Sequence, residues 1–586
     1  MTLGEARKEG MATEMTGAET LVKSLQDLGV TQVFGYAGAT ILPVFHALAK
    51  AGIKITVNAN EQSCAFSAAG YSRASDRVGV AVVTSGPAIT NTLTAVADSN
   101  ADSIPLLVFA GQVPQKKLGT DEFQHINVTG VFAEAAKKVI LVTENNSDIE
   151  TVVKDAYFFA RSGKPGPVVI DLPLDQQRKV GYYAGTSPEK LRLKYDDERH
   201  LGRNQCREFY RLLQGAKRPL LYIGGGLNSR AGSEKIRAFN RMFNIPSINS
   251  LMGKGILDES LDTSLGMLGM YGTPYANMAI QETDLFVAFG VRWDDRVAQR
   301  VGEAGLEANI AYFDINAAKV QEVRVTRNPR FSFIGDAKTA LDDLLEYAKE
   351  NTIRLDIEPW QQRVTHLKRA FRLDYNRTAE AIQQAEVIDL LSTFITETTK
   401  ITTGVGNHQM LAAQYLKIPQ PKSFLTASGF GTMGFALPAA VGAHYADPTA
   451  TVIAVDGDGG IKMNMGEIHT IGSLRIPVKV LLLNNHGDGM LRNIQAADYG
   501  AVYVATERCY DANFAEIARQ CGFAFCRKIT KRPDLLPALR EFIAAEGPAF
   551  LEVVTDKDEV VYPKIPAGKG YRDMILGPFI KRPEGR

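Results

Sequence analysis

The stretch at residues 451–490 reads TVIAVDGDGGIKMNMGEIHTIGSLRIPVKVLLLNNHGDGM. Its first apolar run, Val452–Val455, ends at the glycine-rich turn DGDGG, and a helical segment separates it from a second run, Val478–Leu483. A crossover helix returns the chain to a neighbouring parallel strand, so the two runs end at the same edge of one sheet. The pattern predicts a parallel α/β sheet with polar residues at its carboxyl edge.

The polar residues at this edge predict a phosphate and cation site. Asp458 follows the first run and Asn485 follows the second, so we expect them side by side. Carboxylate and amide oxygens are ligands that Mg²⁺ prefers, and they leave room for the oxygens of a diphosphate. Backbone N–H groups at Gly457 and Gly459 can donate to the same phosphates. The alternative is an ordinary glycine-rich turn in a doubly wound sheet.

Length and composition favour a multidomain globular protein. The chain has 586 residues, a net charge of +1 and 45% hydrophobic residues, which argues against a nucleic-acid-binding or disordered protein. Its five cysteines are scattered, as in proteins of a reducing cytosol. No apolar run approaches the length that spans a bilayer, and the N-terminal residues contain no apolar signal core. We expect a cytoplasmic protein without membrane or nucleic-acid partners.

Strand-like and helix-like segments alternate along most of the chain, which predicts three doubly wound parallel-sheet domains in series. Polar linkers separate them, the first at Tyr182–Gly202 and the second at Tyr347 to about Thr378. The expected divisions are a polar leader (1–15), a first domain (16–182), a central domain (203–346), a third domain (381–560) and a tail (561–586).

The spaced G-D-G and N-N pattern resembles the signature of thiamine-diphosphate (ThDP) enzymes. Further segments resemble the acetohydroxyacid synthase (acetolactate synthase) large-subunit family, and the resemblance covers about residues 16–566. They include VFGYAGATILPVF, VVTSGPAITNTLTAVADS, GQVPQKKLGTDEFQ, GKPGPVVIDLP, LGMLGMYGTPYAN, FGVRWDDRVAQ, GFGTMGFALPAAVGA and LNNHGDGML. This resemblance implies that the first domain binds the cofactor's aminopyrimidine, the central domain binds FAD and the third binds the diphosphate.

The resemblance assigns the cofactor's acid to Glu61, at a strand-to-helix junction followed by AAGYSRAS. A carboxyl group hydrogen-bonded to the pyrimidine ring promotes the imino tautomer, whose nitrogen then takes the thiazolium proton. Without the surrounding segment, Glu61 could equally be a surface residue or a helix cap.

Other cofactor contacts are also implied by the resemblance. Gly431 would accept the pyrimidine amino group through its carbonyl, and Met433, unbranched and polarisable, would support the bent cofactor. Gly487 would join Asp458 and Asn485 at the metal through its backbone oxygen. The remaining residues that the resemblance places at ThDP or FAD are Met490, Gly225, Gly226, Met270, Asp314 and Asp336.

The RWDDR segment contains two arginines with different implied roles. By the resemblance, Arg292 contacts FAD and Arg296 binds the carboxylate of the incoming 2-oxoacid. A planar guanidinium matches a carboxylate bidentately, which makes arginine suitable. A solvated ion-pair loop with Asp294 and Asp295 is the alternative.

Phe123 and Gln124, in GTDEFQ, are implied to line the reaction pocket. His125 and His486 are expected to be structural or to face solvent rather than to carry protons.

Four residues depart from the family's pattern. Ala39 replaces a glycine, Asn60 a histidine, Leu174 a lysine and Ile494 a tryptophan. The tryptophan helps to choose the second 2-oxoacid, and a methylene-scale change can shift selectivity about 10-fold. The departures at Ala39, Leu174 and Ile494 therefore leave the donor and acceptor open.

The implied activity is that of a transferase or lyase of branched-chain amino acid biosynthesis. It decarboxylates a 2-oxoacid such as pyruvate and joins the remaining fragment to a second 2-oxoacid, with ThDP and Mg²⁺ as cofactors and a flavin that takes no part in redox chemistry. Alternatives are a relative with another donor or acceptor, a redox flavoenzyme and an inactive regulatory paralogue. A homodimer or homotetramer is implied, and a small regulatory subunit is compatible with the resemblance. The tail resembles the family's closing segment, with glycine and proline residues typical of a lid, so deletion from Lys569 should impair turnover more than folding.

Overall fold

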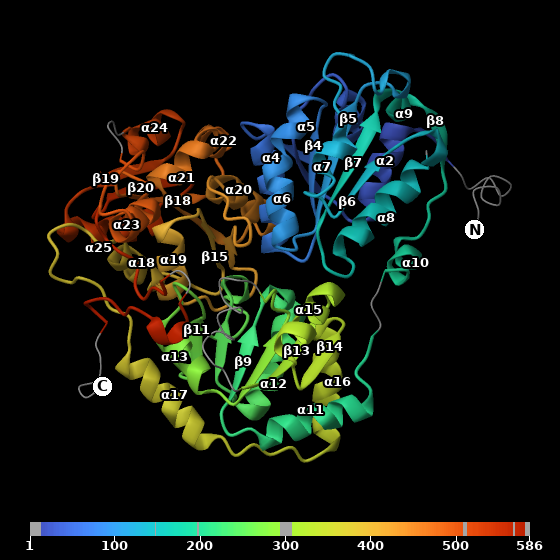
Figure 1. Cartoon of the computed structure of the whole chain (residues 1–586). Helices are drawn as coiled ribbons and strands as arrows, with labels where there is room; N and C mark the ends of the chain where they lie inside the picture. The colour runs from blue at the N-terminus through green and yellow to red at the C-terminus, as the bar shows by residue number, and fades with distance from the viewer. Residues whose placement is uncertain are drawn as a thin grey trace. The chain divides into compact units, whose positions relative to one another are not determined.

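The computed structural model describes residues 13–146, 148–195, 199–293, 308–507, 512–566 and 569–580. Three parallel sheets of six strands follow one another along the chain, with helices on both sides of each (Figure 1). This confirms the predicted α/β class with three doubly wound domains.

The first sheet has the strand order β3-β2-β4-β5-β7-β6, so the chain changes direction across the sheet between β2 and β4. Its strands are β2 (Gln32–Gly35), β3 (Lys54–Thr56), β4 (Gly79–Val83), β5 (Leu106–Gln112), β6 (Lys138–Leu141) and β7 (Pro167–Pro173). The helices of this region are α2 (Gly17–Asp27), α3 (Leu42–Lys50), α4 (Glu61–Ala74), α5 (Pro87–Asn91), α6 (Leu93–Ala101), α7 (Val128–Phe132), α8 (Ile149–Arg161), α9 (Leu174–Arg178) and α10 (Pro188–Leu193).

The central sheet has the order β11-β10-β9-β12-β13-β14 and its switch point lies between β9 and β12. Its strands are β9 (Pro219–Ile223), β10 (Ser247–Asn249), β11 (Ser264–Met267), β12 (Leu285–Phe289), β13 (Asn309–Asp314) and β14 (Phe331–Ile334). Its helices are α11 (Arg203–Gly215), α12 (Arg230–Phe243), α13 (Pro274–Glu282), α15 (Ala317–Arg327), α16 (Ala337–Glu350) and α17 (Glu358–Ala370).

The third sheet has the order β16-β15-β17-β18-β20-β19, with the switch point between β15 and β17. Its strands are β15 (Thr399–Thr403), β16 (Phe424–Thr426), β17 (Thr451–Gly457), β18 (Lys479–Asn484), β19 (Phe525–Ile529) and β20 (Ala549–Val554). Its helices are α18 (Gln384–Ser392), α19 (Asn407–Tyr415), α20 (Ala436–Ala446), α21 (Asp458–Met463), α22 (Gly466–Ser473), α23 (Gly489–Asp498), α24 (Phe514–Gln520) and α25 (Leu535–Ala544).

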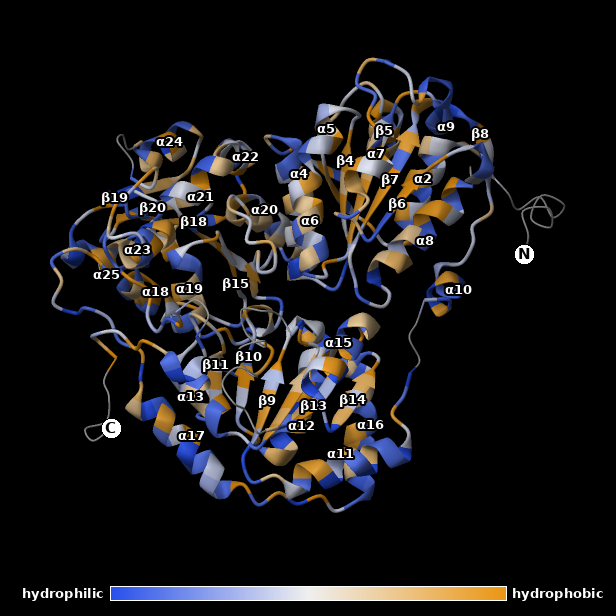
Figure 2. Ribbon diagram, in the orientation of Figure 1, coloured by the Kyte–Doolittle hydropathy of each residue, from blue (hydrophilic) through white to orange (hydrophobic). Residues whose placement is uncertain are grey.

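Central strands are apolar along their whole length because helices cover both faces of each sheet. Every residue of β4 and of β9 is buried, and Figure 2 shows the hydrophobic colour concentrated on such strands. The covering helices are amphipathic: α12 buries Ile236, Phe239 and Phe243 at helical spacing and is capped by the Ser229 side chain, which accepts from Gly232 N. The spacing of the apolar residues and the capping side chains therefore determine where these helices form.

Helices α4 and α20 are exceptions, because almost all of their residues are buried. Small side chains let them approach closely: a Cβ on Gly70 would lie 2.4 Å from the Ala439 carbonyl oxygen, and one on Gly442 would lie 1.9 Å from that of Ser67. Larger residues at these glycines would force the pair apart, so the pairing depends on them.

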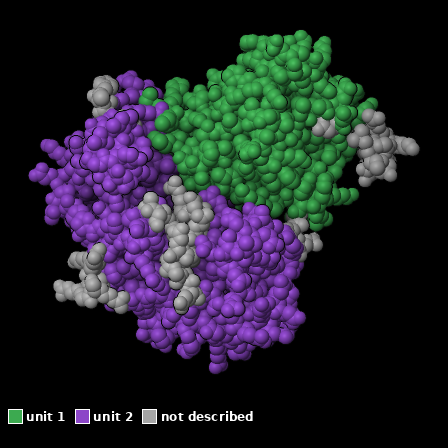
Figure 3. Space-filling view, viewed as in Figure 1, with its two compact units in different colours: residues 1–196, 427–449, 463–478 green, residues 197–426, 450–462, 479–586 purple. Residues whose placement is uncertain are grey.

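The chain forms two compact units, coloured separately in Figure 3. The first contains residues 1–196, 427–449 and 463–478, and therefore includes α20 and α22. The second contains residues 197–426, 450–462 and 479–586, with the central sheet and the whole third sheet. We describe each unit by itself.

Part of the segment that we expected to be a leader forms a strand. Strand β1 (Thr13–Thr16) pairs antiparallel with β8 (Val180–Tyr183), which includes the first residues of the expected linker. Thr16 then caps α2 by accepting from Glu19 N at 3.2 Å. The ribbon could not be predicted because both strands have only four residues and neither alternates apolar and polar residues.

The tail packs on the second unit in its described part, residues 561–566 and 569–580. Tyr571 is 1% exposed within a cluster on the central sheet, and Leu576 and Ile580 form a smaller cluster. Deletion from Lys569 removes all three side chains. The truncated protein should therefore unfold at a lower temperature because core contacts are lost, and a still larger loss of turnover stays a prediction. That the tail closes over the site stays a prediction.

Candidate active site

Asp458, Asn485 and Gly487 meet at the carboxyl edge of the third sheet, and we call these three residues the cation edge. Asp458 begins α21 after β17, and Asn485 follows the neighbouring strand β18. One end of the Asn485 amide lies 3.0 Å from Asp458 Oδ1 and 2.8 Å from the carbonyl oxygen of Gly487, and an NH₂ group at this end donates to both.

If the Asn485 amide instead presents its oxygen here, three oxygens lie close together and repel one another unless a cation lies among them. Ligand distances of 2.0–2.1 Å in an octahedral Mg²⁺ site place neighbouring oxygens about 2.9 Å apart. Among the described residues no three His, Cys, Asp or Glu side chains converge as metal ligands. A cation here would therefore depend on one carboxylate, one amide and one backbone oxygen, and the observed spacing fits it.

A buried donor lies beside the cation edge. Asn407 is 6% exposed at the start of α19, and its Nδ2 makes no hydrogen bond to the described residues. A Cβ on Gly489 would lie 2.5 Å from the Asn485 amide and 2.8 Å from Asn407 Nδ2, so this glycine allows the close approach. A buried amide donor without a partner is suited to a phosphate oxygen. Sequence reasoning missed Asn407, although GVGNH directly follows a β-rich run.

His408 and Asp456 form a second buried pair that the sequence did not single out. His408 Nε2 lies 3.5 Å from Asp456 Oδ1, and Gly457 N donates to that oxygen at 2.9 Å. Burial lowers the pKa of His408 to about 4 and raises the pKa of Asp456 to about 8. A Cβ on Gly460 would lie 2.1 Å from Asp456 Oδ1, which explains why the turn needs a glycine there.

Glu61 is the first residue of α4, as the strand-to-helix junction predicted. Asn60 caps the helix by accepting from Ser63 N at 2.8 Å, so this departure from the family's histidine serves as an N-cap. The half-buried Glu61 carboxylate accepts from Asn91 Nδ2 at 2.8 Å. Its second oxygen is available to a ligand at this helix end.

Glu467, on α22, holds the segment before Glu61 and was missed from the sequence. It is fully buried and accepts from Asn58 Nδ2 at 2.8 Å and from Ala59 N at 2.7 Å. Burial raises its pKa, against these hydrogen bonds. No local pattern in GEIHTI signals this role, because its partners lie about four hundred residues away in sequence.

Gly431 and Met433 lie in the loop between β16 and α20, in the same unit as Glu61. Gly431 has φ of +70°, which a residue with a side chain rarely adopts, and the space around its Cα is open. Met433 is half-buried, and the neighbouring Gly434 carbonyl accepts from Asn464 Nδ2 at 2.9 Å. The loop can thus present a backbone carbonyl and a flexible apolar side chain together.

The predicted pocket residues of the first unit occupy loops and helix starts. Phe123 is 83% exposed and Gln124 has φ of +61°; a Cβ on Gly86 would lie 2.9 Å from Gln124 Cβ, so the two segments touch. Ala39 is exposed after β2, and Leu174 begins α9.

Two positions of the second unit lie on α23. Met490 and Ile494 are four residues apart and therefore share a helix face, and Ile494 is 39% exposed. The two histidines agree with expectation: His125 Nε2 accepts from Gly119 N, and His486 is exposed.

The residues predicted to contact FAD lie where strands of the central sheet end. Gly225 and Gly226 follow β9, and Arg292 follows β12, the neighbour across the switch point. Asp314 ends β13 and accepts from Asn316 N at 2.8 Å, and Asp336 caps α16 after β14. Ligands of doubly wound sheets bind at such switch points.

Close backbone contact explains one of these glycines, because a Cβ on Gly226 would lie 2.8 Å from Gly290 Cα. Met270, before α13, is half-buried and accepts from Ile565 N through its carbonyl at 3.2 Å. Arg296 lies outside the described residues, as do Asp294 and Asp295.

A cavity of about 270 Å³ in the second unit is separate from these groups. It is lined by acidic residues and by aromatic residues such as Tyr375 and Tyr415, and no predicted site residue lines it. The residue types and their placement at strand ends, rather than this hollow, therefore locate the site.

Comparison with known proteins identifies the domains of the chain. The thiamine pyrophosphate enzyme domains match in order: the N-terminal TPP binding domain at residues 15–131, the central domain at 206–344 and the C-terminal TPP binding domain at 404–553. No helix among the described residues is long and apolar enough to cross a membrane.

Similar curated proteins are acetolactate synthases. Acetolactate synthase 2, chloroplastic, of Nicotiana tabacum is 38% identical over 575 residues, covering 95% of this chain and 85% of that protein. The rice enzyme acetolactate synthase 1, chloroplastic, is 36% identical, covering 97% and 89%. The acetolactate synthase large subunit of Pyropia yezoensis is 35% identical, covering 97% and 96%. The plant names specify chloroplasts, so a cytoplasmic location stays a prediction. The chain belongs to the acetolactate synthase large-subunit family of thiamine-diphosphate enzymes.

Proposed function

We propose that the protein decarboxylates pyruvate and joins the remaining two-carbon fragment to a second 2-oxoacid, with ThDP and Mg²⁺. The observation that carries this proposal is the convergence of the Asp458 carboxylate, the Asn485 amide and the Gly487 carbonyl at the cation edge. Bound ThDP would supply a nucleophilic carbon that adds to the 2-oxoacid and accepts the electrons left by CO₂.

The chain's own residues would bind and activate the cofactor. Asp458, Asn485 and Gly487 would hold Mg²⁺ with the diphosphate, and Asn407 Nδ2 would donate to a phosphate oxygen. The free oxygen of Glu61 would form a hydrogen bond to the pyrimidine nitrogen, while the Gly431 carbonyl would accept from the exocyclic amine. Arg296 is proposed to bind the substrate carboxylate, with Phe123 and Gln124 beside it.

FAD is proposed at the switch point of the central sheet, beside Gly225, Gly226 and Arg292, without a redox role. Purified protein should retain or take up FAD with an oxidised spectrum. Adding pyruvate without oxygen should leave that spectrum unchanged. Bleaching would favour the redox flavoenzyme instead.

We propose a homodimer or homotetramer, because members of this family combine the first and third domains of different subunits into one site. Sedimentation at assay concentration tests this. A fully active monomer would contradict it. No observation on the chain bears on a regulatory subunit.

Product analysis tests the activity and the acceptor. Protein with ThDP, Mg²⁺ and FAD is given pyruvate alone or pyruvate with 2-oxobutyrate, and products are identified by mass spectrometry. Acetolactate or acetohydroxybutyrate supports the proposal. Release of CO₂ or acetaldehyde without ligation would favour a relative with another acceptor. Absence of both CO₂ and ThDP binding would favour an inactive paralogue, which no present observation favours.

A further inference from the structure

Arg73, Asp98 and Asp102 form a buried cluster of charges in the first unit. The Arg73 guanidinium donates to Asp98 Oδ2 at 2.7 Å and to Asp102 Oδ2 at 3.0 Å, and the three side chains are at most 2% exposed. Arg73 lies in the last turn of α4, Asp98 on α6, and Asp102 caps that helix. Figure 1 shows α4 and α6 side by side.

The same carboxylates hold the loop that contains Gly431. Asp102 accepts from Ser428 N at 2.9 Å and from Gly429 N at 2.7 Å. Asp98 accepts from the Thr432 hydroxyl at 3.1 Å. The loop is therefore fixed on both sides of its tip.

Only Phe430 and Gly431 lie between the fixed positions. Phe430 is 56% exposed, and Gly431 has its positive φ at the same tip. The Arg73 guanidinium also lies 5.0 Å from the ring centroid of Phe435, on the other side of Met433. The exposed tip of the loop, Phe430 and Gly431, is therefore directly connected to residues that the buried cluster holds in place.

Charge balance explains why the loop is part of the cluster. One guanidinium faces two carboxylates, so an excess negative charge is buried. Burial raises the pKa of Asp98 to about 6, although Arg73 acts in the opposite direction. Donors from Ser428, Gly429 and Thr432 satisfy the remaining acceptors, and moving the loop away would leave buried carboxylate oxygens without them.

We propose that Arg73, Asp98 and Asp102 are positioning residues for the cofactor, fixing the direction in which the Gly431 carbonyl and the Met433 side chain meet the aminopyrimidine. This inference rests on the proposed function, since it requires ThDP at this loop. The three residues do not touch the cofactor in the proposal but act through the loop.

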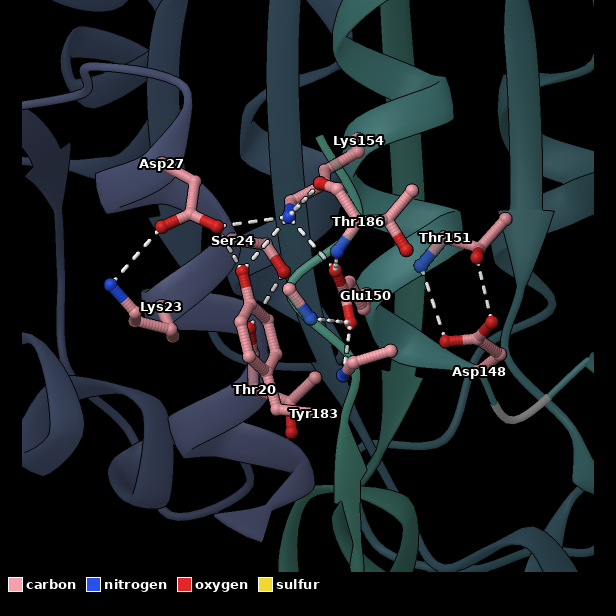
Figure 4. Close-up of polar contacts among 12 residues, drawn as sticks. Thr20, Lys23, Ser24, Asp27, Asp148, Glu150, Thr151, Lys154, Tyr183 and Thr186 are labelled. Atoms are coloured by element: carbon pink, nitrogen blue, oxygen red, sulfur yellow. Dashed lines mark hydrogen bonds and ion pairs between the residues drawn. The ribbon is translucent and has the colours of Figure 1, made fainter. Parts of the chain in front are cut away.

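A matched control exists in the same unit. Lys154 is fully buried and contacts Asp27 and Glu150 at 2.9 Å each. Glu150 also accepts from backbone N–H groups of the 184–186 loop. Figure 4 shows this network. This network also combines one cation, two carboxylates and a loop, but it holds no predicted site residue. Glu150→Gln should therefore lower thermal stability without changing the cofactor's state.

The test compares Asp102→Asn, Thr432→Val and Glu150→Gln with the wild-type protein. Three quantities are measured: the unfolding temperature, the dissociation constant for ThDP with Mg²⁺, and the rate at which the thiazolium C2 proton of bound ThDP exchanges with deuterium at saturating cofactor. Thr432→Val removes one hydrogen bond and should slow exchange about threefold to tenfold. Asp102→Asn replaces one accepting oxygen by an NH₂ group that faces an N–H donor, and should slow exchange about 10- to 100-fold. Both variants should bind ThDP more weakly, and Glu150→Gln should match the wild type in exchange rate and affinity.

Several outcomes distinguish the hypotheses. Wild-type exchange no faster than that of free ThDP would refute the proposed function itself. Fast wild-type exchange with unchanged rates in both loop variants, or with an equal loss in Glu150→Gln, would overturn the positioning role. If Asp102→Asn does not fold, Thr432→Val decides alone, because its loss of one hydroxyl leaves both ion pairs in place.

Discussion

The cation edge differs in construction from the Glu61 end, by which we mean Glu61 and the loop that contains Gly431. At the cation edge, one turn and one strand end place Asn485 in direct contact with both Asp458 and Gly487. At the other end, Glu61 and the Gly431 loop are held by Glu467, Arg73 and other residues from distant segments. The two regions therefore meet different requirements. A hard cation needs a few oxygen ligands at short spacing, whereas activation of the cofactor needs precise orientation, which the tertiary structure supplies.

Replacement of Glu61 should have the largest effect on catalysis. Glu61→Gln should lower kcat about 10²- to 10⁴-fold, the range for a lost acid–base group, while ThDP affinity changes little. Steady-state kinetics and a ThDP titration measure both. Equal losses in kcat and affinity would show that Glu61 only holds the cofactor.

Asp458→Asn should have the opposite profile. Loss of the carboxylate should weaken Mg²⁺ binding more than about 100-fold, because a direct ligand matters more than its supporting residues. High Mg²⁺ should restore part of the activity, which it should not do for Glu61→Gln. An unchanged Mg²⁺ requirement would show that the cation edge does not bind Mg²⁺.

Ile494→Trp, on α23, tests which residue determines the choice of acceptor. We expect the preference between pyruvate and 2-oxobutyrate as acceptor to change about 10-fold, because the bulky ring alters the pocket volume. Competition between the two acceptors, with products counted by mass spectrometry, measures it. Val325→Trp, at an 85% exposed position of α15, is the control and should leave the ratio unchanged. The account of selectivity fails if both variants behave alike.

The smallest expected effect is a change in the stability of the first domain when Asp171, in β7, is replaced. Its side chain is 3% exposed, accepts from Gln112 Nε2 at 3.3 Å, and burial raises its pKa to about 7. Since the folded state keeps a proton that the unfolded state loses above about pH 4, stability falls as pH rises from about 4 to 7 and is then level.

Asp171→Asn should therefore unfold a few degrees above the wild type at pH 8, and the difference should shrink at pH 5. Differential scanning calorimetry at both values checks the sign. A difference that is the same at both pH values would mean that Asp171 has an ordinary pKa.

Residues within one local stretch could be predicted from the sequence, whereas residues that distant segments hold in place could not. Asp458 and Asn485 could be predicted from the residues because strand, turn and crossover lie within one stretch, whereas Glu61 was predicted only through the resemblance of its segment to the family's. Glu467, Arg73 and Asp98 were missed because their contacts join segments that only the packing of α4, α6 and α20 brings together. The β1–β8 ribbon was missed because its strands lack apolar alternation.

The ratio of CO₂ released to pyruvate consumed tests the central claim most directly. The protein with ThDP and Mg²⁺ is given pyruvate as the sole substrate, and both quantities are followed in one vessel. Carboligation to acetolactate predicts one CO₂ for every two pyruvates, with no release when Mg²⁺ is removed. One CO₂ for each pyruvate, or consumption that does not depend on Mg²⁺, would contradict it.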